Sequence, residues 1–348
     1  MKHYLSFAVV LMLAITGCKT ESDYLMQDSD IATLKGAVKT SKMLVGDASD
    51  VKTNTTGGAC LMGGSTDVDE AFIWMINKSG GGDFVVIRAD NSTGYNSYIY
   101  NLIPGRVNSV ETIVIAKSTD AKSDVIAQKI KNAEALFIAG GDQKNYVTIW
   151  KNTPVEDAIN YLVNIKKIPV GGTSAGCAIL GSSYFAALAG TVTSAEAMAN
   201  PYSPLVTLEH DDFLNLPYLQ NTITDQHFSQ RDREGRLITF MARMVKDFGK
   251  NPRGIAVDEQ TAVCIDENGI AKVFGLNNAF FLQKTNEGPE ECTPGVPLTW
   301  NKNQQAINVY RIAGSAEGNG SFDLTNYTKA TGGNWLYYYV TYGMFYTN

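Results

Sequence analysis

The 348-residue chain has no excess of basic residues, because 29 Lys and Arg are outnumbered by 35 Asp and Glu and the formal net charge is −6. Proteins that hold nucleic acid need a basic face, so we expect no nucleic-acid partner. Internal repeats and low-complexity blocks are also absent from the sequence. With 44% hydrophobic and 18% charged residues, the composition is globular and the length suits one large α/β domain or two smaller ones.

The apolar stretch near the amino terminus, Phe7–Ile15, is too short to span a bilayer. It follows Lys2 and His3 and runs into Ala14-Ile15-Thr16-Gly17-Cys18, which is similar to the lipobox of bacterial lipoproteins. In such proteins the signal is removed before the Cys, which is then acylated. We therefore expect residues 1–18 to be a signal peptide and Cys18 to anchor an exported lipoprotein at a membrane, either periplasmic or on the outer membrane or cell surface. The alternative is a plain secretory signal.

Cysteine is scarce beyond Cys18. The four others are Cys60, Cys177, Cys264 and Cys292. No pair of them has the spacing of zinc ligands, and the first three lie in apolar runs where a thiol behaves as a small hydrophobe. We therefore expect no metal, no cofactor and no obligatory disulfide.

Strand and helix patterns alternate from about residue 58. Apolar, β-branched runs predict buried strands at 84–89, 110–116, 135–139 and 168–171. Apolar residues at helical spacing predict helices at 67–77, at 123–132 and at 145–166, the last with a break at Pro154. This order predicts the α/β class, with a parallel sheet, helices on both faces and ligands at the carboxyl ends of the strands.

The organisation along the chain follows from these patterns and from composition. Residues 19–57 read as a tether and 58–270 as the α/β domain. After residue 270, Gly, Asn and Thr increase and helical patterns disappear, which predicts a β-rich extension over 271–348.

The segment Gly172-Thr173-Ser174-Ala175-Gly176 has the G-x-S-x-G pattern of a serine on a tight turn between a strand and a helix. A strand is predicted immediately before it, and residues 177–180 continue as a helix. Ser174 is therefore the candidate nucleophile, with the Ala175 amide as one donor to an oxyanion. The alternative is a glycine-rich turn with a capping serine.

A serine nucleophile needs a base, and only two histidines follow the predicted signal peptide. His227 is the better candidate because it lies just after a predicted strand at 222–224, in a polar stretch. His210 is expected in a surface loop. Three arginines follow His227, namely Arg231, Arg233 and Arg236. Arginine suits bidentate capture of carboxylates, although a solvated helix face would show the same spacing.

The third member of the site should be a carboxylate that orients His227. Glu259 is our choice, from an apolar strand-like run at 254–263 that two acids interrupt, with Asp258 on the opposite face. Glu196 and Asp225 are held in reserve.

These segments together resemble the cyanophycinase and peptidase E family of serine peptidases. The resemblance rests on Gly63–Asp69, on Phe137–Gln143 with its Gly-Gly-Asp-Gln string, on Gly171–Gly176 and on Asp225–Leu237, with Val257–Glu259 as a weaker match. It implies a flavodoxin-type layered α/β fold related to class I glutamine amidotransferases. It also implies Ser174 as nucleophile, His227 as base and a Glu as the orienting acid, for which Glu196 competes with Glu259.

The same resemblance implies further site residues. The backbone of Gly141 and Asp142 would complete the oxyanion hole beside Ala175. The residues expected to line the substrate site are Gln143, Asp225, Gln226, Arg231, Arg233 and Arg236.

The expected function is that of a serine-type exopeptidase acting through an acyl-enzyme on β-aspartyl-arginine or other aspartyl peptide bonds, with a peptide or cyanophycin-like polymer as substrate. The alternatives are an esterase-like α/β-hydrolase, although the chain has no His-Gly-Gly-type oxyanion loop, and a non-catalytic surface lipoprotein that binds peptides or glycans. Cleavage at internal bonds of the substrate, instead of at its end, and assembly into a homodimer are left open.

Overall fold

The computed structural model describes residues 43–90, 92 and 94–348, which belong to one compact unit. The predicted signal peptide, Cys18 and the first part of the tether lie outside these residues. None of the helices in the described part of the chain is both long and apolar enough to cross a membrane.

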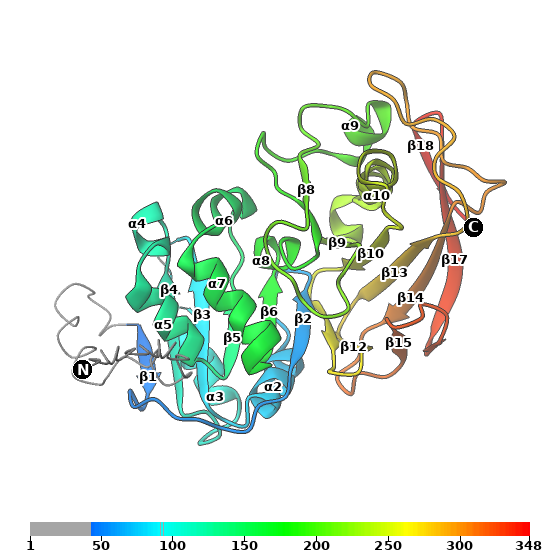
Figure 1. Ribbon diagram of the computed structural model, residues 1–348. Coiled ribbons are helices and arrows are strands. Elements are labelled where there is room, and N and C mark those ends of the chain that lie inside the picture. Colours follow the sequence, from blue (N-terminus) through cyan, green and yellow to red (C-terminus); the bar gives the residue numbers. More distant parts are fainter. Residues whose placement is uncertain (1–42, 91, 93) are drawn as a thin grey trace, which may run out of the picture. The chain divides into compact units, whose positions relative to one another are not determined.

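A ten-stranded sheet has the order β1-β4-β3-β5-β6-β2-β11-β12-β15-β16 (Figure 1). Its strands are β1 (Leu44–Gly46), β2 (Gly58–Met62), β3 (Asp83–Arg88), β4 (Ser109–Val114), β5 (Ala135–Ile138), β6 (Pro169–Thr173), β11 (Thr261–Ile265), β12 (Ile270–Gly275), β15 (Ser321–Asp323) and β16 (Ala330–Thr331). The five neighbours β4, β3, β5, β6 and β2 are parallel, and the outer strands pair antiparallel. The carboxyl ends of the five parallel strands therefore meet at one edge.

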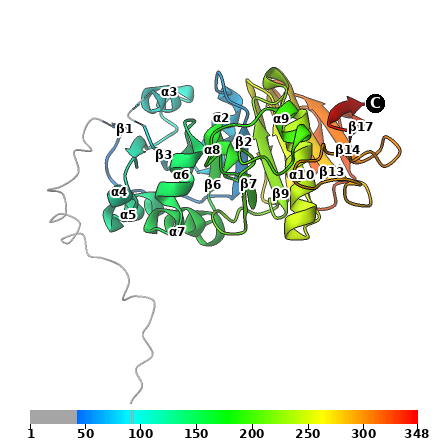
Figure 2. The same cartoon turned by 90° about the horizontal axis from the view of Figure 1, so that it is seen from above.

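Helices cover both faces of this sheet, as Figure 2 shows for α3 on one side and α5 and α7 on the other. On one face lie α2 (Asp69–Lys78) and α3 (Tyr95–Leu102), and on the other α4 (Ser118–Ala121), α5 (Asp124–Asn132), α6 (Gln143–Trp150) and α7 (Pro154–Tyr161). Along β3, Phe84 joins the core under α2, whereas the next residue, Val85, joins the core under α5. Both faces need apolar residues, which explains the unbroken apolar runs. The predicted α/β architecture is confirmed.

The predicted helix over 145–166 is divided at Pro154. Helix α6 ends at Trp150, Pro154 is the first residue of α7, and a π-helical turn, η2 (Leu162–Lys166), follows. Proline is tolerated at the start of a helix, where its missing N–H has no partner, but not in the interior.

A second sheet has the order β18-β17-β14-β13-β10-β9. Its strands are β9 (Thr222–Gln226), β10 (Arg253–Val257), β13 (Asn278–Lys284), β14 (Ile307–Ala313), β17 (Gly333–Thr341) and β18 (Met344–Thr347). Only β9 and β10 are parallel. Smaller elements are α8 (Ala175–Ala178), α9 (Ser194–Ala199), η3 (Ser229–Arg231) and the pair β7 (Ser183–Phe185) and β8 (Leu208–His210).

The fifteen-residue helix α10 (Glu234–Phe248) packs on this second sheet, and the sequence patterns above did not anticipate it. Its buried face contributes Leu237, Phe240 and Met241 to a core shared with Trp300 and Val340. The helical spacing of its apolar residues was the available signal. The arginines near its start had been interpreted as substrate contacts rather than as part of a helix.

The residues after 270 extend both sheets, with β12, β15 and β16 in the first and β13, β14, β17 and β18 in the second. They contain no α-helix, in agreement with the predicted β-rich character. The division of the chain into a peptidase domain and an extension at residue 270 stays a prediction.

Candidate functional site

Ser174 lies in the turn that joins β6 to the short helix α8. Its backbone angles, φ 51° and ψ −119°, are sparsely populated for a residue with a side chain, and such strain is concentrated at functional sites. A Cβ on Gly172 would lie 2.6 Å from the carbonyl carbon of Gly176, and one on Gly176 would lie 2.1 Å from the carbonyl oxygen of Ile138. The glycines of the motif are therefore required by close approach of the backbone. The helix that follows is shorter than expected and ends at Ala178.

His227 and Glu259 come from two parallel neighbours of the second sheet. His227 directly follows β9, and Glu259 is the second residue after β10. Because carboxyl ends of parallel strands meet at one edge, both side chains reach Ser174. His227 Nε2 is 2.8 Å from Ser174 Oγ, and His227 Nδ1 is 2.6 Å from Glu259 Oε1.

The loop after β2 holds the imidazole from the other side. The His227 amide donates to the Gly63 carbonyl at 2.9 Å, and the Ser174 amide donates to the Met62 carbonyl at 3.1 Å. Gly64 has φ +100°, and a Cβ there would lie 2.5 Å from His227 Nε2. This loop belonged to the family resemblance, but the sequence alone did not indicate that it packs against the histidine.

Burial lowers the pKa of His227 below its ordinary value, and the charges of Arg231 and Arg233 lower it further, while Glu259 opposes the shift. The imidazole is thus neutral at neutral pH. We place its proton on Nδ1, because the Glu259 carboxylate can only accept there. Nε2 then presents its lone pair to the Ser174 hydroxyl.

The other candidate carboxylates occupy different places. Asp258 is buried, and its carboxylate accepts from the backbone amides of Ser229 at 2.8 Å and Asn278 at 3.1 Å. Glu196 is exposed and caps α9 by accepting from the amide and hydroxyl of Thr193. Of these acids, Glu259 is the one bonded to His227.

His210 lies in β8, where its ring packs on Phe248 with a centroid distance of 4.0 Å and faces Asp211. We had expected a surface loop. The backbone instead pairs with Ser183 of β7.

A cavity of about 560 Å³ opens beside Ser174 and His227. The residues expected at the oxyanion hole, Gly141, Asp142 and Ala175, all line it. So do Gln143, Gln226, Arg231, Arg233 and Arg236.

The three arginines differ in their surroundings. Arg236 is buried and makes a bidentate contact with Asp225, with Nε 2.8 Å and Nη2 2.5 Å from the carboxylate oxygens. Arg233 donates to the Gln226 carbonyl at 2.6 Å, and burial lowers its pKa to about 10. The Arg231 side chain is 52% exposed. Arg231 is thus the least engaged of the three.

Asp225, expected to line the substrate site, is not among the cavity residues. Its side chain is almost fully buried and holds Arg236, with Arg233 3.5 Å away. A buried carboxylate between two guanidinium groups is satisfied by them, so it acts on the cavity through Arg236.

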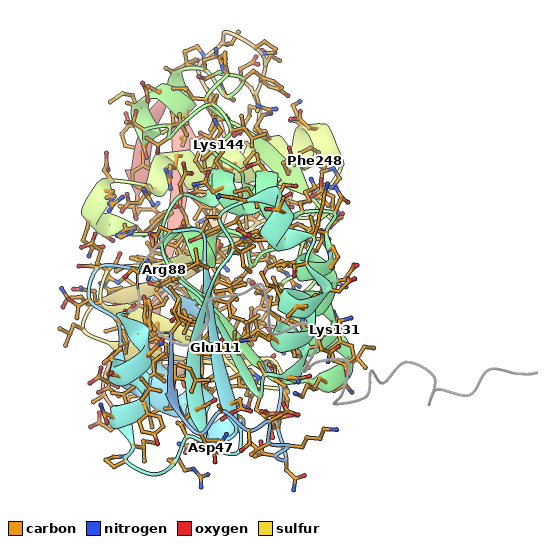
Figure 3. All side chains as sticks on the ribbon, turned by 90° about the vertical axis from the view of Figure 1, so that its left-hand side faces the viewer. Asp47, Arg88, Glu111, Lys131, Lys144 and Phe248 are labelled. Atoms are coloured by element: carbon orange, nitrogen blue, oxygen red, sulfur yellow. The ribbon has the colours of Figure 1, made fainter. Side chains whose placement is uncertain are left out.

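A second cavity of about 410 Å³ adjoins the first, and both are lined by Gly141, Ser174, His227 and Arg231. Figure 3 labels one residue of each cavity, Lys144 of the larger and Arg88 of the smaller. In the described part of the chain, no group of His, Cys, Asp and Glu side chains could hold a metal ion.

The region that contains this site is similar to known peptidases. Residues 106–273 match the model of peptidase family S51. The chain is 28% identical over 176 residues to the cyanophycinase of Trichormus variabilis, covering 51% of this chain and 54% of that protein, and 27% identical over 169 residues to the cyanophycinase of Synechococcus elongatus, covering 49% and 48%. Over residues 106–273, just under half of its length, this chain is similar to peptidase family S51.

The chain spans about half the length of the curated relatives it matches. Among solved structures, it is similar to a peptidase from an acI-B1 Actinobacterium, with a TM-score of 0.43 and 16% identity, covering 65% of this chain and 90% of that one. The S51 match includes Ser174, His227 and Glu259, whereas the Gly63–Gly64 loop lies outside it.

Replacing Asp225 with Ala should destabilise the fold, because Arg236 would remain buried without its partner. Removing one member of a buried ion pair lowers the free energy of unfolding by about 3–5 kcal/mol. Denaturant unfolding followed by circular dichroism measures the loss. The double variant Asp225→Ala/Arg236→Leu, in which the buried Arg236 charge is no longer stranded, should be more stable than Asp225→Ala alone. Equal stability of the wild type and the single variant would contradict this role.

Proposed function

We propose that this chain is a serine-type exopeptidase in which Ser174, His227 and Glu259 act as nucleophile, base and orienting acid. The observation that carries the proposal is the continuous hydrogen-bonded path from Ser174 Oγ through both nitrogens of His227 to Glu259. A neutral imidazole at this position has the lone pair that general-base catalysis requires.

The reaction is an acyl transfer in two steps. His227 Nε2 takes the Ser174 proton while Oγ attacks the scissile carbonyl, and the tetrahedral oxyanion accepts hydrogen bonds from the backbone amides of Ala175 and the Gly141–Asp142 turn. The imidazolium then gives its proton to the leaving amine. Water, deprotonated by the same histidine, attacks the acyl-enzyme and restores the Ser174 hydroxyl.

The substrate is a peptide with a carboxylate near the scissile bond. Arg231 and Arg233 line the cavity beside Ser174, and Glu259 and Asp225 offset only part of the charge of the arginines there. A guanidinium pairs well with a carboxylate. Aspartyl peptide bonds, including the β-aspartyl-arginine units of a cyanophycin-like polymer, fit this requirement, and cyanophycinases are among the relatives.

Replacing Ser174 with Ala should lower kcat/KM on aspartyl peptides and on cyanophycin by at least about 10³-fold, as expected when a triad member is removed. A fluorophosphonate probe should label wild-type protein and the His210→Ala control, but not Ser174→Ala. Labelling without peptide turnover, but with ester turnover, would favour an esterase. No labelling of folded protein would favour a non-catalytic binding protein.

The pH dependence follows from the lowered pKa of His227. Because the base works only when neutral, kcat/KM should fall on the acidic side at a pH below the ordinary histidine value of about 6.5. Arg231→Gln removes a cation that lowers this pKa, so the acidic limb should move to higher pH. The profile is measured for both proteins on one substrate. A limb that stays in place, or moves to lower pH, would contradict the assignment of His227.

The protein is held at a membrane surface by acyl chains on Cys18, which becomes the first residue after removal of residues 1–17. The lipobox-like sequence Ala14–Cys18 supports this localisation. An alkyne fatty acid supplied to cells that express the gene should label wild-type protein, which should fractionate with membranes. Cys18→Ser should abolish both. Membrane fractionation that is unchanged in Cys18→Ser would rule out this anchor.

A further inference from the structure

The smaller cavity beside Ser174 is built from the carboxyl ends of four neighbouring strands. Arg88 ends β3 and Asp90 follows it, Gly140 and Gly141 follow β5, Thr173 ends β6, and Asp67 lies in the loop after β2. The chain leaves β3 for β4 on one side and returns to β5 on the other. Ligands in open α/β sheets bind at such a reversal of strand order.

The polar groups of this cavity are unequally satisfied. Arg88 forms an ion pair with Asp90. In contrast, Asp67 Oδ1 and Thr173 Oγ1 are both buried, and neither makes a well-formed hydrogen bond within the described residues, although the Tyr95 and Thr173 hydroxyls lie near the carboxylate. Buried polar atoms without partners are rare in folded proteins and call for a specific explanation.

The environment of Asp67 favours a cationic partner. Burial raises its pKa to about 6, with a smaller contribution from the charge of Asp69, while the hydroxyls of Tyr95 and Thr173 oppose the shift. A nearby positive charge would stabilise the carboxylate and supply the missing hydrogen bond. Arg88 is already paired, and Arg231, the other cation at the cavity wall, lies 3.9 Å from Glu259.

We propose that this cavity is a second substrate subsite, in which the Asp67 carboxylate and the Thr173 hydroxyl receive a positively charged nitrogen group, either an ammonium or a guanidinium. The proposal rests on the proposed peptidase function. The two cavities meet at Ser174, where they share Gly141, His227 and Arg231, and the rest of their walls differ. A substrate with its reacting carbonyl at Ser174 therefore has its carboxylate at Arg231 and Arg233 and its cation at Asp67.

Matched peptides test this subsite. One pair of aspartyl peptides carries arginine or the uncharged isostere citrulline next to the scissile bond, and a second pair has a free or an acetylated amino terminus. In the wild type, neutralising one of these two positions should lower kcat/KM by about 10- to 100-fold, as for loss of a hydrogen bond to a charged group. The pair that responds identifies the source of the cation.

The variant Asp67→Asn should bring the ratio of kcat/KM for the charged and neutral peptides close to one. A merely structural role would lower both values together and leave the ratio unchanged. Asp69→Asn is the matched control, because Asp69 lies two residues away, bonds to the Tyr98 hydroxyl and does not line the cavity. Its ratio should stay as in the wild type.

Failure of the subsite and failure of the peptidase assignment give different results. If the peptides are cleaved but the ratio is near one in the wild type, or persists in Asp67→Asn, the subsite is overturned and the peptidase stands. If no peptide is cleaved, the subsite is tested by binding alone. The same peptides are titrated calorimetrically into Ser174→Ala protein and into the double variant Ser174→Ala/Asp67→Asn. Tighter binding of the charged member that depends on Asp67 supports the subsite, and its absence overturns it.

Discussion

The interaction on which the site depends is the hydrogen bond between Ser174 and His227, because it crosses from one sheet to the other. Ser174 is held at the end of β6 in the first sheet, whereas His227 and Glu259 end the adjacent parallel strands β9 and β10 of the second. The position of the serine relative to the histidine is therefore set by how the two sheets meet. The loop after β2 lies at this junction, where Gly63 accepts from the His227 amide and Gly64 leaves room for the imidazole.

Charge is distributed unevenly around this junction. The larger cavity holds arginines whose charge the surrounding carboxylates only partly offset, and the smaller one holds the Asp67 carboxylate, one oxygen of which is buried without a well-formed hydrogen bond in the described part of the chain. The same arginines help to keep His227 neutral. In the proposed function, substrate recognition and activation of the base are thus coupled through electrostatics, because a cation that attracts a carboxylate also disfavours the imidazolium.

Arg236 both lines the larger cavity and forms a buried ion pair. Its guanidinium lines the larger cavity, lies near the rings of Phe185 and Phe240 and is held by Asp225. The sequence pattern placed all three arginines and Asp225 together as substrate contacts. Burial distinguishes Asp225 and Arg236 from Arg231, because the two buried groups already pair with each other in the absence of a ligand.

Several features could be read from local pattern alone. The β-branched runs predicted the central strands, because strands covered on both faces need apolar residues at every position. Pro154 marked the predicted break in the helix over 145–166, because proline lacks the N–H that a helix interior needs. The G-x-S-x-G turn identified Ser174, since its glycines are required by contacts only a few residues away or with the next strand. The preference for Glu259 over Glu196 also came from its strand-like surroundings.

Tertiary structure decided what depends on contacts between distant segments. The bond of Glu259 to His227 joins residues 32 positions apart, and the bond of His227 to Ser174 spans 53. The packing of Gly64 on the imidazole, the partnership of Asp225 with Arg236 and the unpartnered oxygen of Asp67 likewise arise only when separate strands end at one edge. Local periodicity records which side of an element is buried. It does not specify which side chain from a distant segment packs against that buried side.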